Sequence, residues 1–424
     1  MPCCPDQSSS ACDDTSREIR VSTASGSRSP LPLALAWIEE ELNDLSTRDL
    51  LRKPKLRTGR QGRSVVLDGR TLVNFGSNDY LGYAGDVRLI KAASKAACSE
   101  GFGAGASPLV SGQSQAHRKL EEDIASLLQT DRAILFSSGY AANVATISAL
   151  VGPGDLIASD ERNHASLIDG CRLSNAEVLI YPHRDMAHLE TLLSGVKTAR
   201  RKLIVTDSVF SMDGTRAALD DLAAIASKHR AIFMVDEAHA TGVYGLRGSG
   251  LVEATGTADG VHVRVGTLSK ALGSAGGFVA GPSQFMEWLS HKARSWIFST
   301  AHPPAVAAAA SCAIQLLQRE PSRRIDLLAH SREFARRVAS LLHDDAFAAW
   351  DTQIVPIVCH TAHAAVNMSL RLAEKGLYVP AIRPPSVPHG KSLVRVSLSS
   401  QHTTEDLENL ALAVHAVRGS SCSQ

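Results

Sequence analysis

The chain has 424 residues, a formal net charge of +1 and 44% hydrophobic residues. This length predicts two packed lobes with a sizeable core. The near-zero charge argues against a global electrostatic design for nucleic acid or an anionic membrane. No apolar stretch approaches the roughly 20 residues that span a bilayer, so neither nucleic acid nor membrane is an expected partner.

The cysteines indicate a reducing compartment. The eight cysteines are scattered and no pair has C-x-x-C spacing, which favours free thiols in a cytoplasmic enzyme. Only Cys3, Cys4 and Cys12 are close enough in sequence to share a metal ion, and no histidine or fourth cysteine stands near them. We therefore expect no metal site.

The N-terminal part is expected to lead into the first domain. Residues 1–30 are polar and lack an apolar core segment, which predicts a disordered extension. Leu31–Leu51 has the apolar spacing of a helix. The run SVVLDGRTLVNF predicts a hairpin that turns at Asp68-Gly69. Residues 31–84 thus form a helix-and-hairpin segment.

Residues 85–302 alternate between helical and strand-like segments, which predicts a large α/β domain with a mostly parallel sheet. Its strand-length apolar runs are RAILFSSG, DLIASDE, AEVLIYP, RKLIVTDSVFS, AIFMVDEAH, VHVRVGTLSK and GGFVAG. Residues 303–424 change to a long helical stretch, followed by a helix at Ala364–Lys375. Short strands at Gln353–Cys359 and Leu393–Leu398 flank that helix. This predicts a smaller α+β C-terminal domain.

Polar residues end several of these apolar runs: Ser138-Gly139, Asp207-Ser208, Asp236–His239 and Thr267–Lys270. In an open parallel sheet, ligands bind beyond the carboxyl ends of the strands. We therefore expect these residues to converge on a single site.

The letters D-E-A-H at Asp236–His239 also occur in nucleic-acid helicases. Such a helicase needs a G-x-x-x-x-G-K-[ST] phosphate loop upstream, and the sequence has none. The Gly-rich run Gly101–Gly112 nominally matches a dinucleotide fingerprint. However, it follows a helical segment and carries Pro108 where a helix should begin. Both nucleotide interpretations are therefore disfavoured.

An organic electron sink suits the strand-end residues better. A carboxylate such as Asp236 can keep a pyridinium nitrogen protonated, and Lys270 can tether the ring as a Schiff base. The hydroxyls of Thr267 and Ser269 suit phosphate oxygens. The strand-to-helix turn Ser138–Asn143 offers backbone N–H groups and a helix dipole to a phosphate dianion.

Seven motifs make the chain resemble a known family. They occur in the order S-N-D-Y-L-G (77–82), L-F-S-S-G-Y-A-A-N (135–143), N-H-A-S (163–166), V-F-S-M-D-G (209–214), V-D-E-A-H-A-T-G (235–242), G-T-L-S-K-A-L-G (266–273) and I-R-P-P-S-V-P (382–388). Over about residues 45–415 the sequence resembles the α-oxoamine synthases, pyridoxal-phosphate enzymes of fold type I. The resemblance implies a mostly parallel seven-stranded sheet, a smaller C-terminal domain and a homodimer.

The resemblance also implies a reaction. An amino acid loses its α-proton on the cofactor and attacks an acyl thioester, and the resulting β-keto acid loses CO₂. Lys270 would be the Schiff-base lysine and main acid/base. Asp236 would pair with the ring nitrogen, His239 would contact the ring phenolate and His164 would stack on the ring.

The resemblance implies roles for further residues in the matching motifs. Ser211 and Thr267 would contact the cofactor, and Gly139 and Tyr140 would lie near its phosphate. Asn78 and Tyr80 are expected to brace the dimer interface.

Four residues are expected to bind substrate, and His164 is one of them because it would also help to place the substrate on the ring. Arg383 would clamp the amino-acid carboxylate bidentately. Ser386 keeps a hydroxyl where relatives commonly have Thr. Arg52 stands at the sequence distance expected of an acyl-substrate arginine. Pro108 departs from many relatives, so acyl preference can differ.

The amino-acid donor divides the family. H-A-T-G after Asp236-Glu237, together with S-T-A-H-P-P-A-V-A-A-A at 299–309, resembles the alanine-using 8-amino-7-oxononanoate synthases of biotin synthesis. These condense L-alanine with a pimeloyl thioester, carried by coenzyme A or a carrier protein. The alternatives are relatives that use glycine or serine: 5-aminolevulinate synthases, 2-amino-3-ketobutyrate ligases and serine palmitoyltransferases. A catalytically silent partner subunit is a further alternative, against which Lys270 argues.

Overall fold

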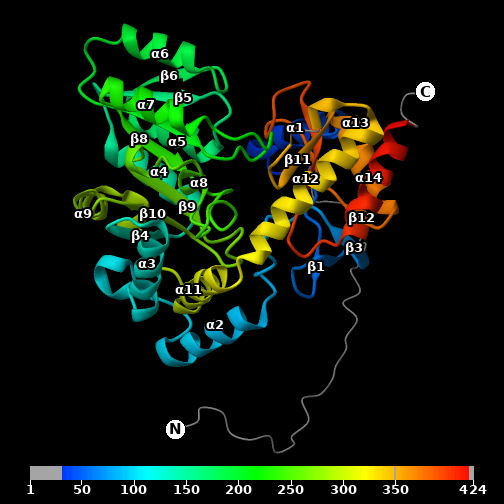
Figure 1. Ribbon diagram of the computed structural model, residues 1–424, viewed down its shortest axis with the longest axis horizontal. Coiled ribbons are helices and arrows are strands. Elements are labelled where there is room, and N and C mark those ends of the chain that lie inside the picture. The colour runs from blue at the N-terminus through cyan, green and yellow to red at the C-terminus, as the bar shows by residue number, and fades with distance from the viewer. Residues whose placement is uncertain (1–30, 348–349, 420–424) are drawn as a thin grey trace, which may run out of the picture. The chain divides into compact units, whose positions relative to one another are not determined.

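The computed structural model describes residues 31–347 and 350–419 (Figure 1). The chain divides into two units, Met1–Lys53 and Pro54–Gln424. In the first unit a 3₁₀ turn, η1 (Leu33–Leu35), precedes helix α1 (Trp37–Thr47). This confirms the helix expected within Leu31–Leu51. The expectations for residues 1–30, including those for the three cysteines there, lie outside the described residues.

The second unit begins with the expected hairpin. Strands β2 (Ser64–Leu67) and β3 (Arg70–Asn74) pair antiparallel. Asp68 and Gly69 turn between them with φ of 48° and 80°, the left-handed region that Asp and Gly tolerate best. Two short strands, β1 (Arg57–Thr58) and β12 (Leu377–Tyr378), complete a four-stranded sheet. The hairpin thus shares a sheet with a C-terminal strand.

All seven apolar runs form one sheet in the order β4-β10-β9-β8-β7-β5-β6. Its strands are β4 (Arg132–Phe136), β5 (Leu156–Asp160), β6 (Glu177–Tyr181), β7 (Lys202–Asp207), β8 (Ile232–Asp236), β9 (Val263–Thr267) and β10 (Gly277–Gly281). β10 runs antiparallel to both of its neighbours, and the other pairs are parallel. The predicted α/β fold class with a mostly parallel seven-stranded sheet is confirmed.

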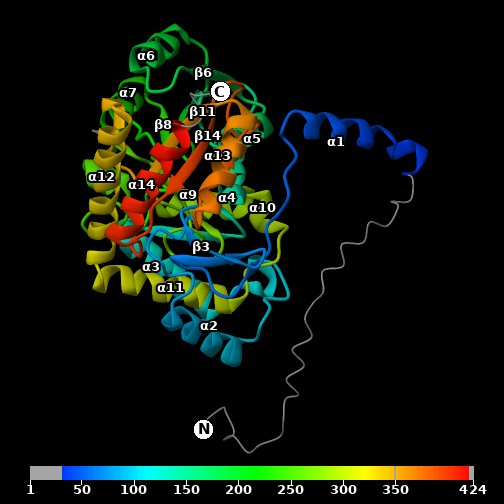
Figure 2. The same ribbon diagram turned by 90° about the vertical axis from the view of Figure 1, so that its right-hand side faces the viewer.

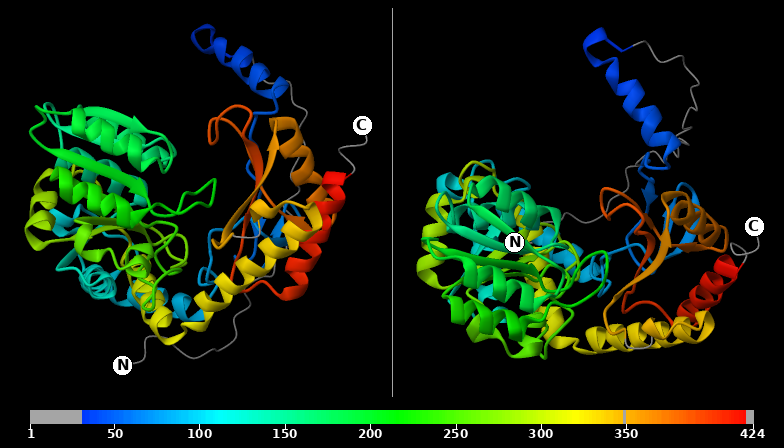
Figure 3. Two further views of the ribbon diagram at one scale, coloured as in Figure 1. Left: turned by 45° about the horizontal axis from the view of Figure 1, so that its top comes forward. Right: turned by 90° about the horizontal axis from the view of Figure 1, so that it is seen from above.

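The sheet is buried on both faces. In β4, Ala133 and Leu135 belong to one core cluster while Ile134 and Phe136 belong to another. Each strand alternates its side chains between the two faces, so runs that read as continuously apolar need cover on both sides. Helices lie on either side of the sheet (Figures 2 and 3).

Buried residues assign these helices to the two faces. One core includes residues of α3 (Gln115–Leu128), α7 (Leu219–His229) and α11 (Pro304–Arg319). The other includes residues of α4 (Gly139–Leu150), α5 (Ala165–Ser174) and α9 (Ser283–Lys292). The remaining helical elements in residues 54–320 are α2 (Val87–Glu100), η2 (Pro108–Gly112), α6 (Met186–Gly195), α8 (Leu251–Thr255), η3 (Ala258–Gly260) and α10 (Arg294–Ile297).

The C-terminal elements follow the expected pattern. The three-stranded sheet β11-β14-β13 contains the two predicted strands. The C-terminal region around this sheet comprises α12 (Ser322–Leu342), η4 (Asp345–Phe347), β11 (Ile354–His360), α13 (Ala362–Glu374), β13 (Ala381–Ile382), β14 (Ser392–Ser397) and α14 (Thr404–Gly419). The domain limits at 84/85 and 302/303 stay predictions.

The described residues contain neither a helix that could span a membrane nor a cluster of metal-binding side chains. None of the helices within 31–347 and 350–419 is long and apolar enough to cross a membrane. In the same ranges, no group of three or more His, Cys, Asp or Glu side chains is arranged to hold a metal ion.

Glu237 has a structural environment at the end of β8. Its side chain is 1% exposed, and its two carboxylate oxygens accept hydrogen bonds from the backbone N–H groups of Leu251 and Val252, each at 2.9 Å. Arg264 lies 3.7 Å away as its cationic partner. Gly250, at φ 136°, leaves the space that the carboxylate fills, because a Cβ there would lie 1.4 Å from it. Glu237 therefore ties the loop before α8 to the sheet.

We expect Glu237→Ala to lower the free energy of unfolding by about 3 kcal/mol, because removing one partner leaves a buried arginine and two amides uncompensated. Glu237→Gln, which keeps an acceptor oxygen, should cost less. Urea unfolding of both variants measures this. A loss below about 1 kcal/mol for Glu237→Ala would show that the contact is not needed.

Candidate active site

The strand ends converge as expected. β9, β8 and β7 are adjacent in the sheet, and Asp236 pairs in register with both Asp207 and Val265. The loops that leave β9, β8 and β7 therefore begin side by side at one edge. Lys270, the residues after Asp236 and the residues after Asp207 stand on these loops.

The carboxylate of Asp236 is held from two directions. It is 4% exposed. One oxygen accepts a hydrogen bond from the backbone N–H of Ala238 at 2.7 Å, and the other accepts one from Nδ2 of Asn143 at 2.6 Å. Asn143, on α4, also donates to the hydroxyl of Ser166 at 2.8 Å. These bonds fix the orientation of the carboxylate.

Lys270 lies in the electrostatic field of this carboxylate. Burial lowers the pKa of its amine from 10.5 to about 8, and the negative charges of Asp236 and Asp207 partly oppose that shift. A neutral amine is the nucleophilic form, so the site makes Lys270 more reactive near neutral pH than a surface lysine.

Asp207 is the second buried carboxyl group here. Burial raises its pKa well above the usual range, and the nearby charge of Asp236 adds to the rise. Its Oδ2 accepts a hydrogen bond from the backbone N–H of His164 at 2.7 Å. Two carboxylates side by side disfavour double ionisation, and Asp207 also anchors His164 through this hydrogen bond.

His164 sits at the N-terminal cap of α5. Its Nδ1 contacts the hydroxyl of Ser166 at 2.8 Å, which links it to Asn143 and hence to Asp236. Burial lowers its pKa, and Lys270 contributes to the lowering. The ring is therefore neutral at physiological pH, as suits a side chain that stacks on an aromatic ligand.

His239 is as enclosed as Asp236, since both residues are 4% exposed. Burial lowers its pKa well below the usual value, with further lowering by the charges of Lys270 and Arg395. Its Nδ1 lies 2.6 Å from the hydroxyl of Tyr80. The structure thus brings Lys270, Asp236, His164 and His239 into one electrostatically connected group.

The turn that follows β4 packs tightly on two other loops. Ser138 caps α4 by accepting a hydrogen bond from the backbone N–H of Ala141 at 3.0 Å. A Cβ on Gly139 would lie 3.5 Å from Thr267, and one on Gly277 would lie 2.5 Å from the nitrogen of Gly139. The hydroxyl of Thr267 donates to the carbonyl of Gly276 at 2.8 Å. The α4 N-terminus and Thr267 therefore meet where a phosphate is expected.

Tyr140 and Ser211 border this region. The ring of Tyr140 is half-exposed and its hydroxyl donates to Asp169 of α5. Ser211 lies half-buried in the turn after β7, which the backbone hydrogen bond from Gly214 to Phe210 closes at 2.9 Å. Their contacts with a cofactor stay predictions.

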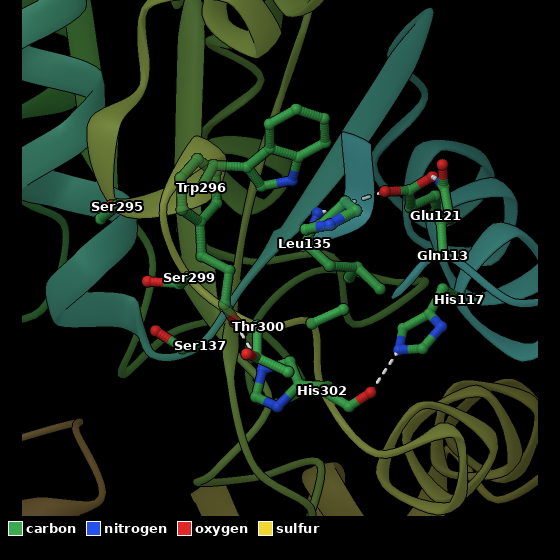
Figure 4. A pocket seen from close by; sticks show the side chains of 13 residues that line it. Gln113, His117, Glu121, Leu135, Ser137, Ser295, Trp296, Ser299, Thr300 and His302 are labelled. Atoms are coloured by element: carbon green, nitrogen blue, oxygen red, sulfur yellow. Dashed lines mark hydrogen bonds between the residues drawn. The ribbon is translucent and has the colours of Figure 1, made fainter. Parts of the chain in front are cut away.

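A small pocket lies next to the β4–α4 turn (Figure 4). Ser137, Ser299 and Thr300 gather on one side of it, and Glu121 and His117 lie on the other. Neither the predicted lysine nor any of the other predicted catalytic residues lines it. It is therefore distinct from the group that would carry the chemistry.

The predicted substrate residues Arg383, Ser386 and Arg52 lie on segments other than the strand-end loops. Arg383 follows β13, and its carbonyl accepts a hydrogen bond from the backbone N–H of Ser386 at 3.0 Å, which closes a turn. Ser386 is exposed. Arg52 belongs to the first unit, Met1–Lys53. The substrate roles of all three residues stay predictions.

The roles of some site residues were not predicted. Asp207 was expected at the site and Asn143 stands in a matching motif, but neither had a predicted side-chain role, and the sequence analysis did not predict Arg395. Tyr80 was expected at a dimer interface, but its side chain is fully enclosed within the chain, so that expectation is wrong. A charged residue in the middle of the buried strand β14 is the signal that could have revealed Arg395.

Comparison with known proteins decides the family. A family model, aminotransferase class I and II, matches residues 70–414. The chain belongs to this family. An 8-amino-7-oxononanoate synthase from Anaeromyxobacter dehalogenans is 45% identical over 91% of the chain and 96% of its own length. Another from Citrifermentans bemidjiense is 44% identical over 89% of the chain and 97% of its length. The resemblance to the α-oxoamine synthases is confirmed.

Solved structures agree. A serine palmitoyltransferase from S. paucimobilis with bound PLP and myriocin superposes with a TM-score of 0.85 at 28% identity, over 92% of the chain and 99% of its own length. An 8-amino-7-oxononanoate synthase from Francisella tularensis gives a TM-score of 0.70 at 27% identity, over 83% of the chain and 99% of its own length.

The lowered pKa of Lys270 predicts a pH profile. The fraction of deprotonated amine rises with pH through about 8, so the rate at which cofactor-free protein attaches added pyridoxal phosphate should rise with pH and level off above 8. Stopped-flow absorbance measures this rate. A midpoint near 10.5, the usual lysine value, would contradict the environment described for Lys270.

Asn143→Ala should weaken pyridoxal-phosphate binding by about tenfold or more, because a hydrogen bond to a charged group contributes about 1.5–3 kcal/mol and about 1.4 kcal/mol is tenfold. Thr146→Val is the matched control. It lies one turn along α4, and its buried hydroxyl has no hydrogen-bond partner among the described residues. Fluorescence titration gives both affinities, and equal affinities would rule out a role for the Asn143–Asp236 bond.

Proposed function

We propose that this protein is a pyridoxal-phosphate-dependent C-acyltransferase that condenses L-alanine with a pimeloyl thioester. The products are 8-amino-7-oxononanoate, CO₂ and the free thiol, as in biotin biosynthesis. The observation that carries the proposal is 45% identity across 96% of an enzyme with this name. The ordered group Lys270, Asp236, His164 and His239 supports it with the residues that the chemistry requires.

The described residues fit the cofactor. Asp236 is a buried carboxylate that accepts two hydrogen bonds, and a protonated pyridine nitrogen would give it a cationic partner. Oδ1 of Asn143 is buried and has no hydrogen-bond partner among the described residues, so a polar group remains to be satisfied there. When bound, pyridoxal phosphate supplies a ring that accepts electron density from the substrate.

Each residue then has a defined task. Lys270 would form the covalent link and would afterwards move the α-proton, for which a pKa of about 8 suits an acid/base group at physiological pH. Asp236 would hold the proton on the ring nitrogen. His239 would donate to the ring phenolate, and His164 would limit the ring's position from one face.

Phosphate and substrate contacts complete the proposed site. The backbone of Gly139 and Tyr140 at the start of α4, with Thr267 and Ser211, would hold the phosphate end of the cofactor. Arg383 would bind the alanine carboxylate, aided by Ser386. We propose Arg52 for the acyl substrate.

We further propose a homodimer that works in the cytoplasm. The acyl carrier is coenzyme A or a carrier protein, and both deliver the same thioester. We propose no nucleic-acid partner, because the net charge of +1 gives no global attraction to a polyanion.

One observation favours an alternative donor. The serine palmitoyltransferase superposes with a higher TM-score than the F. tularensis oxononanoate synthase, 0.85 against 0.70. The residues Ala240-Thr241 after the D-E-A-H letters favour alanine, and so does the sequence identity to the oxononanoate synthases. Alanine is therefore the proposed donor and serine the second candidate.

Titration of the purified holoenzyme with L-alanine, glycine and L-serine separates these donors. We expect alanine to change the absorbance of the bound cofactor at the lowest concentration. It should also be the donor that releases free thiol from pimeloyl-coenzyme A. The same assay with palmitoyl-coenzyme A is the control for acyl-chain choice. Tighter binding and faster turnover with serine would overturn the assignment to alanine.

A further inference from the structure

We propose that Tyr80 sets the tautomer of His239. Its hydroxyl donates a hydrogen bond to Nδ1, which leaves the ring proton on Nε2, where it can be donated to the phenolate of the cofactor. Tyr80 would thus be a positioning residue that acts through His239. This inference rests on the role proposed above for His239, whereas the tautomer itself can be measured whatever the substrate.

The contact is short and sealed from solvent. The oxygen of Tyr80 lies 2.6 Å from Nδ1 of His239. Tyr80 is 0% exposed and His239 is 4% exposed. Water therefore cannot replace either partner, and in such surroundings a lost hydrogen bond is costly. One of the two atoms must carry the shared proton.

Neutral partners leave two possible arrangements. Burial raises the pKa of Tyr80 and lowers that of His239 well below its usual value, so at neutral pH the phenol keeps its proton and the imidazole has one N–H. Either Tyr80 donates to Nδ1 and Nε2 is protonated, or Nδ1–H donates to Tyr80. In the second case the phenol proton must find another acceptor.

The neighbours of Tyr80 favour the first arrangement. A second acceptor of this hydroxyl is Oδ1 of Asn78, at 3.2 Å, which is longer than the 2.5–3.0 Å typical of O–H···O bonds, whereas the side chain of Gln353 lowers the pKa of Tyr80 as a donor would. Oδ1 of Asn78 already accepts a hydrogen bond from Nη1 of Arg395 at 3.0 Å. The phenol proton therefore belongs to the 2.6 Å contact with His239.

Arg395 strengthens this bias. Its Nη2 donates to the oxygen of Tyr80 at 3.3 Å, and a guanidinium has no acceptor. A cationic donor on the phenol oxygen polarises the O–H bond and makes it a better donor. The same charge makes the oxygen a poorer acceptor for an Nδ1–H.

The backbone of His239 is also fixed. Nε2 of Gln353 donates to the carbonyl of His239 at 2.7 Å, and the hydroxyl of Tyr244 donates to Oε1 of Gln353 at 2.9 Å. All of these groups are buried. With backbone and Nδ1 both held, only Nε2 is left to contact a ligand. Sequence distance hides this arrangement, since Tyr80 and His239 are 159 residues apart.

Nitrogen-15 NMR of the histidine side chains in the wild-type holoenzyme tests the tautomer without any substitution. His239→Gln identifies the signal. We expect the pattern of an imidazole that is protonated on Nε2 and accepts at Nδ1. A signal from an imidazole protonated on Nδ1, or from a mixture of the two forms, would overturn the proposal.

A variant pair tests the role of the hydroxyl. Tyr80→Phe removes the donor. Tyr83→Phe is the matched control, because Tyr83 is also 0% exposed and its hydroxyl has no hydrogen-bond partner among the described residues. We expect the visible absorbance of the bound cofactor to titrate with a midpoint shifted by about one pH unit in Tyr80→Phe and unchanged in Tyr83→Phe.

A failure of the Tyr80 proposal can be told apart from a failure of the proposed function. Equal midpoints in the two variants would overturn the role of Tyr80, even if alanine proves to be the donor. Preference for serine would overturn the donor assignment and leave the tautomer result intact. A raised KM for alanine in Tyr80→Phe, without any change in the absorbance midpoint, would show that Tyr80 acts on substrate binding. That result would also overturn the proposal.

Discussion

The buried carboxylate of Asp236 is the constraint on which the site depends. A carboxylate with 4% exposure is costly unless it is hydrogen-bonded and paired with a positive charge. Asn143 and the backbone of Ala238 supply the hydrogen bonds, and Lys270 lies within its field. A protonated ring nitrogen would supply the remaining compensation.

The fold provides this arrangement through the sheet. Because β7, β8 and β9 are neighbours and parallel, Asp207, Asp236 and the loop to Lys270 leave the same edge. Asp207 accepts the backbone N–H of His164, so the second carboxyl group holds the ring that would stack on the ligand. The antiparallel strand β10 places Gly277 against Gly139, which keeps the phosphate end close to the same edge. Two cores, one on each face, hold these strand ends rigid.

Much of this could be predicted from local pattern. The seven apolar strands, the hairpin at Asp68-Gly69 and the helix within Leu31–Leu51 depend on short-range periodicity and turn chemistry, which the sequence displays directly. Asp236 and Lys270 could be predicted because motif order and strand ends point to them. Tyr80 and Arg395 could not be assigned in the same way. Their roles arise from contacts between residues far apart in the chain, and neither residue type indicates a partner by itself.

The most direct test of the central claim is the site of covalent cofactor attachment. The holoenzyme is reduced with borohydride, digested and analysed by peptide mass spectrometry. The account predicts that the pyridoxyl mass is carried by the peptide containing Lys270, the residue held in the field of Asp236. Attachment to a different lysine, or no attachment in an active enzyme, would contradict it.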